Sequence, residues 1–98
     1  MAAMRAVALG FALVTGLASS AALAQGADLL RSKGCLGCHD ADKRKVGPSL
    51  RDIGAKYKGN TSAAADIAGR MKDGRGHPKV AGSDAELKAA VEAAIAAK

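Results

Sequence analysis

The segment Cys35-Leu36-Gly37-Cys38-His39 restricts the fold of this chain more than any other feature of its sequence. Two cysteines separated by two residues and followed directly by a histidine form the attachment pattern of c-type haem. Both thiols can add to the two vinyl groups of one porphyrin, and the adjacent imidazole can then bind the iron. The motif therefore predicts a fold built around one covalently attached haem.

Two other uses of these cysteines stay open on the sequence alone. A disulfide or redox dithiol formed by Cys35 and Cys38 is permitted outside the cytosol, although the expected βαβ context is missing. A zinc site made by Cys35, Cys38, His39 and His77 has the right number of ligands. However, Cys38 and His39 are neighbours in the chain, and the usual pair of spaced histidines is absent. The spacing favours haem over both alternatives.

The amino-terminal segment has the pattern of a secretory signal peptide. Arg5 supplies a positive start, residues 6–18 are apolar, and Ala22-Leu23-Ala24 matches the small residues that precede a cleavage site. Cleavage after Ala24 would remove residues 1–24 and leave one domain, residues 25–98. Because haem of this type is attached outside the bacterial cytoplasm, the signal and the haem motif agree. We expect a periplasmic protein that is soluble after cleavage, and a permanent membrane span is the weaker prediction.

Residues 25–98 offer little material for a hydrophobic core. A chain below about 70–80 residues rarely folds stably on its core alone and usually needs a metal, disulfides or another staple. Tyr57 is the only aromatic residue of the domain. The expected core consists of aliphatic side chains: Leu29, Leu30, Leu36, Ile53, Ile67, Met71, Leu87, Val91 and Ile95.

The hydrophobic pattern predicts an all-α fold of four helices, without strand alternation or internal repeats. The first helix is expected to begin at about Asp28, a candidate N-cap, and to run into the cysteine motif. The second is expected over residues 49–57, directly after Gly47-Pro48.

Capping residues mark the other two helices. Thr61 or Ser62 can cap the third helix, and Gly74 is placed to end it. Ser83 and Glu86 have the spacing of a capping box at the start of the fourth helix.

With the haem motif, the segments KVGPSL, AKYKG, RMKDG and SDAEL resemble the short bacterial class I cytochromes c. These proteins are soluble monohaem electron carriers of the periplasm. The resemblance implies the small class I fold, about four helices wrapped around one covalently attached haem c. An enzymatic role is not expected, because the sequence offers no general acid, second metal site or substrate pocket.

The resemblance also assigns roles to individual residues. Cys35 and Cys38 would form the thioether bonds, and His39 would be the proximal iron ligand. The carbonyl of Pro48 would accept a hydrogen bond from Nδ1 of His39, which fixes the tautomer of the ring. Gly34 is expected to allow close approach where the first and last helices cross.

The chain departs from the family at the sixth iron ligand, which is usually a methionine in the loop before the last helix. This loop has no methionine. His77 takes that place, since it precedes Pro78 and lies six positions before Ser83. The alternatives are Met71 in the third helix, Lys79 in its deprotonated form, and an open position.

Coordination by His39 and His77 predicts electron transfer at a lowered potential, because a methionine ligand raises the potential of cytochromes c. The alternative function is binding or sensing of a diatomic gas, in which His77 gives way. Tyr57 in AKYKG and Met71 in RMKDG complete the residues expected to contact the cofactor.

The net charge of +6 predicts redox partners with acidic docking surfaces. A nucleic-acid partner is not expected. Arg5 is the only charged residue of the signal segment, so the excess of positive charge belongs to the domain. Seven basic residues flank the segments expected to surround the haem: Lys43, Arg44, Lys45, Lys56, Lys58, Arg75 and Lys79.

Overall fold

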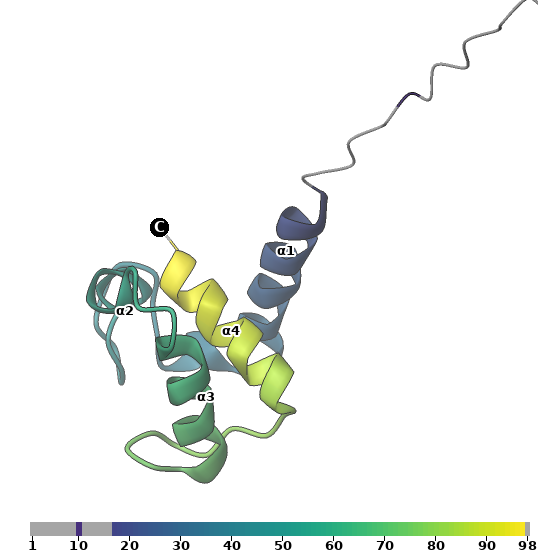
Figure 1. Ribbon diagram of the computed structural model, residues 1–98. Coiled ribbons are helices and arrows are strands. Elements are labelled where there is room, and N and C mark those ends of the chain that lie inside the picture. The colour runs from purple at the N-terminus through teal and green to yellow at the C-terminus, as the bar shows by residue number, and fades with distance from the viewer. Residues whose placement is uncertain (1–9, 11–16, 98) are drawn as a thin grey trace, which may run out of the picture.

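The computed structural model describes residue 10 and residues 17–97, and within these ranges it contains helices and no strand. Most of the expected signal peptide, residues 1–9 and 11–16, lies outside the described residues, as does residue 98. The elements are α1 (Leu17–Ser32), the short 3₁₀ helix η1 (Cys35–Gly37), α2 (Leu50–Tyr57), α3 (Ala63–Asp73) and α4 (Asp84–Ala96) (Figure 1). The all-α prediction is confirmed. Among the residues that the structure describes, no helix has the length and apolar character needed to cross a membrane.

Both predicted boundaries of the first helix are wrong. Helix α1 begins at Leu17, because the Ala- and Leu-rich residues upstream of Asp28 favour helix. Asp28 lies inside the helix and pairs with Arg31 at 3.4 Å instead of capping it. The helix ends at Ser32, before the cysteine motif, since Gly34 adopts a left-handed φ of 73° that a continuing helix cannot use.

The crossing of α1 and α4 depends on Gly26, not on Gly34 as predicted. A Cβ atom at Gly26 would lie 2.8 Å from Cβ of Ala93 and 2.9 Å from the carbonyl oxygen of Ala89. A Cβ atom at Gly34 would meet no atom within 4 Å. The close approach of the two helices, whose crossing Figure 1 shows, therefore lies about two helical turns earlier than expected.

Helix α2 starts where the sequence predicted and packs against the end of α4. The buried hydroxyl of Ser49 accepts a hydrogen bond from the amide of Asp52 at 3.0 Å and caps the helix. A Cβ atom at Gly54 would lie 2.7 Å from the carbonyl oxygen of Ile95. Only glycine allows this approach.

The predicted caps of α3 and α4 are confirmed except at the start of α3. Gly74 ends α3 with a φ of 73°. Ser83 and Glu86 form the reciprocal capping box of α4, with both hydrogen bonds at 3.1 Å. Ser62 occupies the N-cap position of α3, but its side chain donates to Asn60 at 3.0 Å instead of accepting from the helix.

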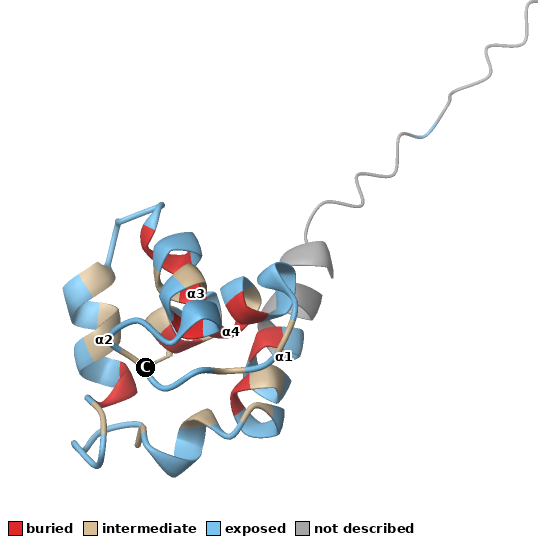
Figure 2. Cartoon of the chain, turned by 90° about the horizontal axis from the view of Figure 1, so that it is seen from below, coloured by how far each residue is buried: buried red, intermediate tan, exposed pale blue. Residues whose placement is uncertain are grey.

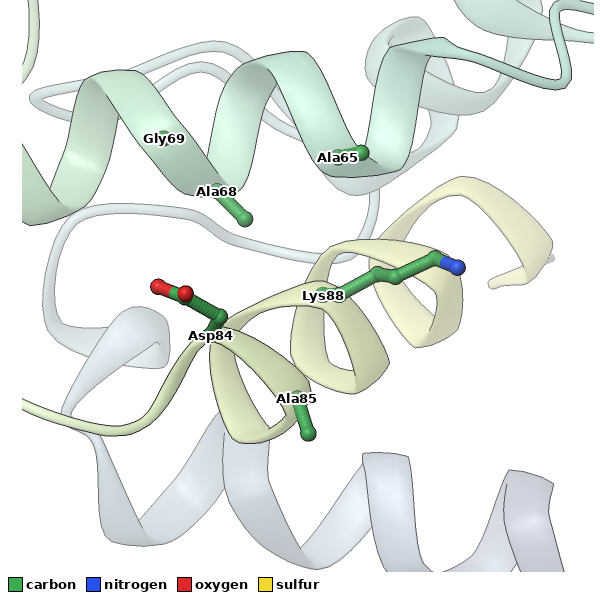
Figure 3. Close-up of a pocket in the computed structure, with 6 residues that line it drawn as sticks. All are labelled: Ala65, Ala68, Gly69, Asp84, Ala85 and Lys88. Carbon is green, nitrogen blue, oxygen red and sulfur yellow. The ribbon is translucent and has the colours of Figure 1, made fainter.

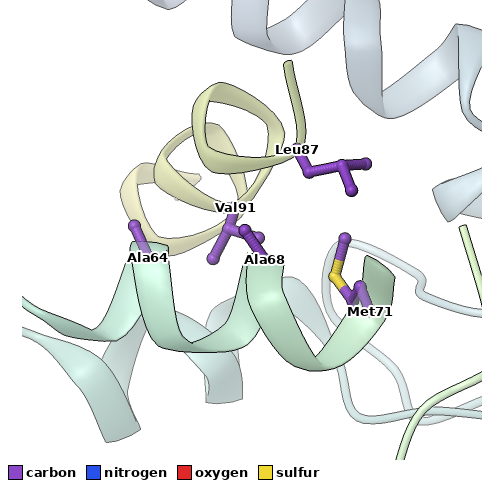
Figure 4. Close-up of a cluster of buried hydrophobic side chains, with 5 residues drawn as sticks. All are labelled: Ala64, Ala68, Met71, Leu87 and Val91. Atoms are coloured by element: carbon purple, nitrogen blue, oxygen red, sulfur yellow. The ribbon is translucent and has the colours of Figure 1, made fainter. Parts of the chain in front are cut away.

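The hydrophobic core is divided between one cluster formed by α3 and α4 and another formed by α1, α2 and α4, and it is as thin as the sequence predicted (Figures 2 and 4). Leu87 is fully buried and Met71 is 6% exposed, with Val80 of the following loop packed against them. Alanine makes up much of the rest. The main cluster consists of Ala64, Ala68, Met71, Leu87 and Val91, and a second one of Leu30, Leu50, Ala90 and Ala94.

Candidate haem site

The cysteine motif folds as a tight turn that leaves both thiols free. The backbone amides of Cys38 and His39 both donate to the carbonyl of Cys35, at 3.2 and 2.9 Å. Cys35 is half-buried, which raises the pKa of its thiol, and Cys38 is exposed. The two sulfurs are not joined as a disulfide. One short turn thus presents two unbonded thiols and a histidine, as attachment to a porphyrin requires.

The zinc alternative receives no support from the arrangement. Within residues 17–97, no three side chains of His, Cys, Asp or Glu gather closely enough to hold a metal ion. A haem iron differs in this respect, because the porphyrin supplies four of its ligands and the protein only two.

The His39 ring is held by a segment distant in the sequence. Its Nδ1 lies 2.6 Å from the carbonyl oxygen of Pro48, the contact that the sequence predicted. A carbonyl only accepts, so Nδ1 carries the proton and Nε2 keeps a free lone pair for a metal. Gly47 packs against the ring, since a Cβ atom there would lie 2.9 Å from Nδ1.

His77 lies in the loop between α3 and α4 and is half-buried. Gly74 and Gly76, with φ of 73° and 67°, let this loop turn back sharply. Nδ1 of His77 lies 2.7 Å from the carbonyl oxygen of Pro78. Its Nε2 is therefore left with a free lone pair, as in His39.

The two imidazole rings lie close together and nearly parallel. Their centroids are 6.2 Å apart and their planes differ by 8°. Two imidazoles that share one metal through bonds of about 2.0 Å have centroids about 6 Å apart. The centroid separation of 6.2 Å equals the value for two imidazoles on one iron, and such binding requires the Nε2 edge of each ring to point at the metal.

Apolar side chains beside His39 also fit a haem. Leu36 and Val46 are the large hydrophobic residues that the described chain leaves exposed, at 42% and 77%. Leu36 was predicted to join the core, but η1 lies at the surface and carries this side chain outward. A porphyrin face is largely apolar, so the residues around His39 match the group that the motif implies.

Met71 and Tyr57 lie elsewhere in the fold, and Lys79 lies two residues beyond His77 in the same loop. Met71 is buried in the core cluster between α3 and α4, which matches the packing alternative considered for it (Figure 4). Tyr57 lines a shallow cavity with residues of α4, and Lys56 Nζ lies 5.4 Å from its ring centroid. Lys79 is exposed. Contact of Met71 and Tyr57 with the cofactor stays a prediction.

A cavity of about 370 Å³ between α3 and α4 belongs to a different part of the molecule (Figure 3). Asp84 at its edge is engaged by Lys72 at 2.7 Å. No cysteine or histidine contributes to it. Its lining consists of Ala65, Ala68, Gly69, Asp84, Ala85 and Lys88.

Sequence reasoning missed two contacts of the site. These are the packing of Gly47 on the His39 ring and the hydrogen bond from Nδ1 of His77 to the carbonyl of Pro78. A signal was present only for the second contact, because Pro78 follows His77 directly in the sequence.

Comparisons with known proteins agree on one family. Residues 23–94 match the family model described as Cytochrome c. Cytochrome c-551 of Pseudomonas aeruginosa is 41% identical over 70 residues, which cover 65% of this chain and 67% of that protein. Cytochrome c-552 of Nitrosomonas europaea is 39% identical over 71 residues, covering 64% and 69%. The crystal structure of wild-type Nitrosomonas europaea cytochrome c552 is similar with a TM-score of 0.62 and 35% identity, covering 74% of this chain and 99% of that one.

Proposed function

Because the chain belongs to the cytochrome c family, as a small class I bacterial member, we propose that it is a periplasmic electron carrier whose iron is bound by His39 and His77. The family attaches one haem c per chain covalently, and such proteins carry electrons and are not enzymes. The haem, when bound, supplies the one-electron ferric/ferrous couple. The signal-peptide pattern at residues 1–24 supports export to the periplasm.

One observation carries the assignment of both ligands. His39 and His77 lie with nearly parallel rings whose centroids are 6.2 Å apart, and each has its Nδ1 occupied by a proline carbonyl. The lone pair of each Nε2 is therefore unengaged, and the centroid separation equals that of two imidazoles that bind one iron through these atoms. Met71, the rival sulfur ligand, is instead used to fill the core.

Two imidazole ligands determine how the protein handles the electron. Neutral nitrogen donors stabilise ferric iron better than a thioether does, so the potential is lower than in a His/Met cytochrome. The hydrogen bonds to Pro48 and Pro78 strengthen this effect, because a ring that donates its Nδ1 proton is a better donor through Nε2. Few bonds change between oxidation states, which suits rapid electron transfer.

The exposed basic residues support an acidic partner surface. All seven basic residues near the haem-motif and loop segments are exposed, and in the described chain only Arg75 among them pairs with a carboxylate, Asp73 at 3.1 Å. Unpaired positive charge steers association with an acidic partner, and salt screens that attraction. We predict that the rate of electron exchange with an acidic redox protein falls as ionic strength rises. Rates indifferent to ionic strength would exclude this mode of docking.

Absorption and electron paramagnetic resonance spectra of the holoprotein test the ligand assignment. The ferric protein is expected to be low-spin and to lack the long-wavelength sulfur-to-iron band. His77→Ala is expected to convert it to a high-spin form, whereas Lys79→Ala, a matched change in the same loop, leaves the spectrum unchanged. A low-spin spectrum retained in His77→Ala would reject His77 as the ligand.

A further inference from the structure

The two histidines are held in different ways. His39 is fixed by Pro48, nine residues away, and by Gly47, whose amide donates to the carbonyl of Cys38 at 2.9 Å. His77 donates only to the carbonyl of its neighbour Pro78. A hydrogen bond between adjacent residues moves with them, so it fixes the tautomer of His77 without fixing its position.

Residues 76–79 form a segment that we call the ligand arm, and its two ends are anchored. At one end the amide of Arg75 donates to the carbonyl of Arg70 at 2.9 Å. At the other end the amide of Val80 donates to the carbonyl of Met71 at 3.0 Å, and the Val80 side chain packs on the core. These anchors define where the arm leaves and rejoins the fold.

Between its anchors the arm has little to hold it. Among the described residues, the only side-chain hydrogen bond of the arm is internal, from Nδ1 of His77 to the carbonyl of Pro78. Gly76 has a φ of 67° and no heavy atom within 4 Å of an added Cβ, and Pro78 and Lys79 are exposed. Segments with few buried contacts open at low free-energy cost.

We infer that the ligand arm is displaceable and that, in the ferrous protein, the position it leaves binds a small neutral diatomic molecule. This rests on the proposed ligation by His77. The exchange breaks the bond between Nε2 of His77 and iron and forms one from iron to the incoming molecule, and no electron or proton is transferred. His77 leaves with its proton still on Nδ1 and hydrogen-bonded to the carbonyl of Pro78, so Nε2 keeps its lone pair and the arm returns ready to bind.

The lack of a buried charge favours a neutral ligand, because the basic side chains of the region, Lys79 included, are exposed to solvent. Ser49 is the only buried polar or charged residue of the described chain, so no buried cation is available to stabilise an anion. Arg75 is engaged by Asp73 at the surface, and the exposed side chains beside His39, Leu36 and Val46, are apolar. A neutral molecule enters such a place without the desolvation cost that an anion bears.

Carbon monoxide binding to the reduced holoprotein tests this inference. The observed rate is expected to reach a plateau as the carbon monoxide concentration rises, because opening of the arm becomes limiting. His77→Ala is expected to bind at a rate that rises without a plateau. If the wild type differs from His77→Ala in its reduced spectrum yet binds no carbon monoxide, the arm is not displaceable. If the two reduced spectra are identical, the proposed ligation itself fails.

A pair of glycine variants separates opening of the arm from general loss of stability. Gly76 and Gly59 are both exposed, have φ of 67° and 78°, and would place a Cβ in open space. Alanine is strained at either position, but only Gly76 lies in the arm. Gly76→Ala is expected to raise the open population, and with it the apparent affinity for carbon monoxide, by about tenfold. Gly59→Ala is expected to leave the affinity unchanged, and equal effects in both variants would overturn the inference.

Limited proteolysis gives a readout that does not depend on the iron spectrum. Trypsin cleaves after Arg75 and Lys79, on either side of the arm, and after Lys58 in the turn between α2 and α3. Carbon monoxide is expected to increase cleavage at Arg75 and Lys79 severalfold relative to Lys58. An unchanged ratio would show that the arm stays in place.

Discussion

The two sides of the haem site differ in what fixes the histidine. On the proximal side, the turn from Cys35 to Pro48 orients His39 through backbone contacts that require no metal. On the distal side, His77 is held by one hydrogen bond to its neighbour Pro78, so in the proposed ligation the iron would fix its position. In the proposed ligation, retention of the cofactor depends on a rigid proximal side and is separate from control of the sixth ligand.

The largest expected effect comes from removing both thiols. With Cys35→Ser and Cys38→Ser together, the porphyrin mass should be absent under denaturing conditions, and the domain should lose most of its helical structure. The core of residues 25–98 is small and rich in alanine, so the fold depends on the group that the thiols attach. Mass spectrometry and circular dichroism measure the two results. A stable, helical apoprotein would contradict this dependence.

Gly47→Ala tests how firmly the proximal side holds His39. The added methyl group would press on the His39 ring, so the ring must move or the backbone must shift, at a cost of about 1–3 kcal/mol in the free energy of unfolding. Gly37→Ala is the matched control, because a Cβ there meets no atom within 4 Å. Urea unfolding of both holoproteins measures the difference. Equal stability of the two variants would show that Gly47 does not clamp the ring.

His77→Met tests the ligand on the distal side. We expect the fold and the covalent haem to be retained, since the substitution leaves the proximal contacts intact. If the arm brings the sulfur to iron, the potential should rise by a measurable part of the roughly 0.8 V that axial ligands span. Redox titration measures this rise. A potential equal to that of the wild type, with a low-spin spectrum, would mean that position 77 is not a ligand.

The smallest expected effect concerns Glu86 in the first turn of α4. Glu86 accepts from the amide of Ser83 and faces Lys33 at 3.6 Å, and these contacts hold the pKa of Glu86 below its ordinary value of 4.5. A lowered folded-state pKa stabilises the fold above pH 4.5, and this contribution is lost as the pH falls through the folded pKa. Glu86→Gln should therefore be less stable than the wild type near neutrality, with a difference that shrinks in acid. Thermal melts near neutral pH and in acid measure the difference. The control is Glu92→Gln, which removes the charge of Glu92 from its exposed pair with Lys88 in α4.

The elements that the sequence predicted well depend on neighbours in the chain. The capping box of Ser83 and Glu86 and the end of α3 at Gly74 are local, and both are confirmed. The cysteine motif is equally local, and the hydrogen bond from His39 to Pro48 was expected from a family resemblance.

The elements that the sequence did not predict depend on contacts in space. Gly26 and Gly34 are both candidates for a close approach, and only the position of α4 selects Gly26. The start of α1 was misplaced because Asp28 has the chemistry of a cap but lies within a longer run of helix-forming residues. The packing of Gly47 on His39 likewise follows from the path of the loop, which no periodicity reveals.

The most direct test of the account is a crystal structure of the ferric holoprotein. We predict Nε2 of His39 and Nε2 of His77 on opposite sides of the iron, each at about 2.0–2.1 Å. The Nδ1 atoms of the two rings should remain hydrogen-bonded to the carbonyls of Pro48 and Pro78. A sixth position held by Met71, Lys79 or water, with His77 turned away, would contradict the central claim.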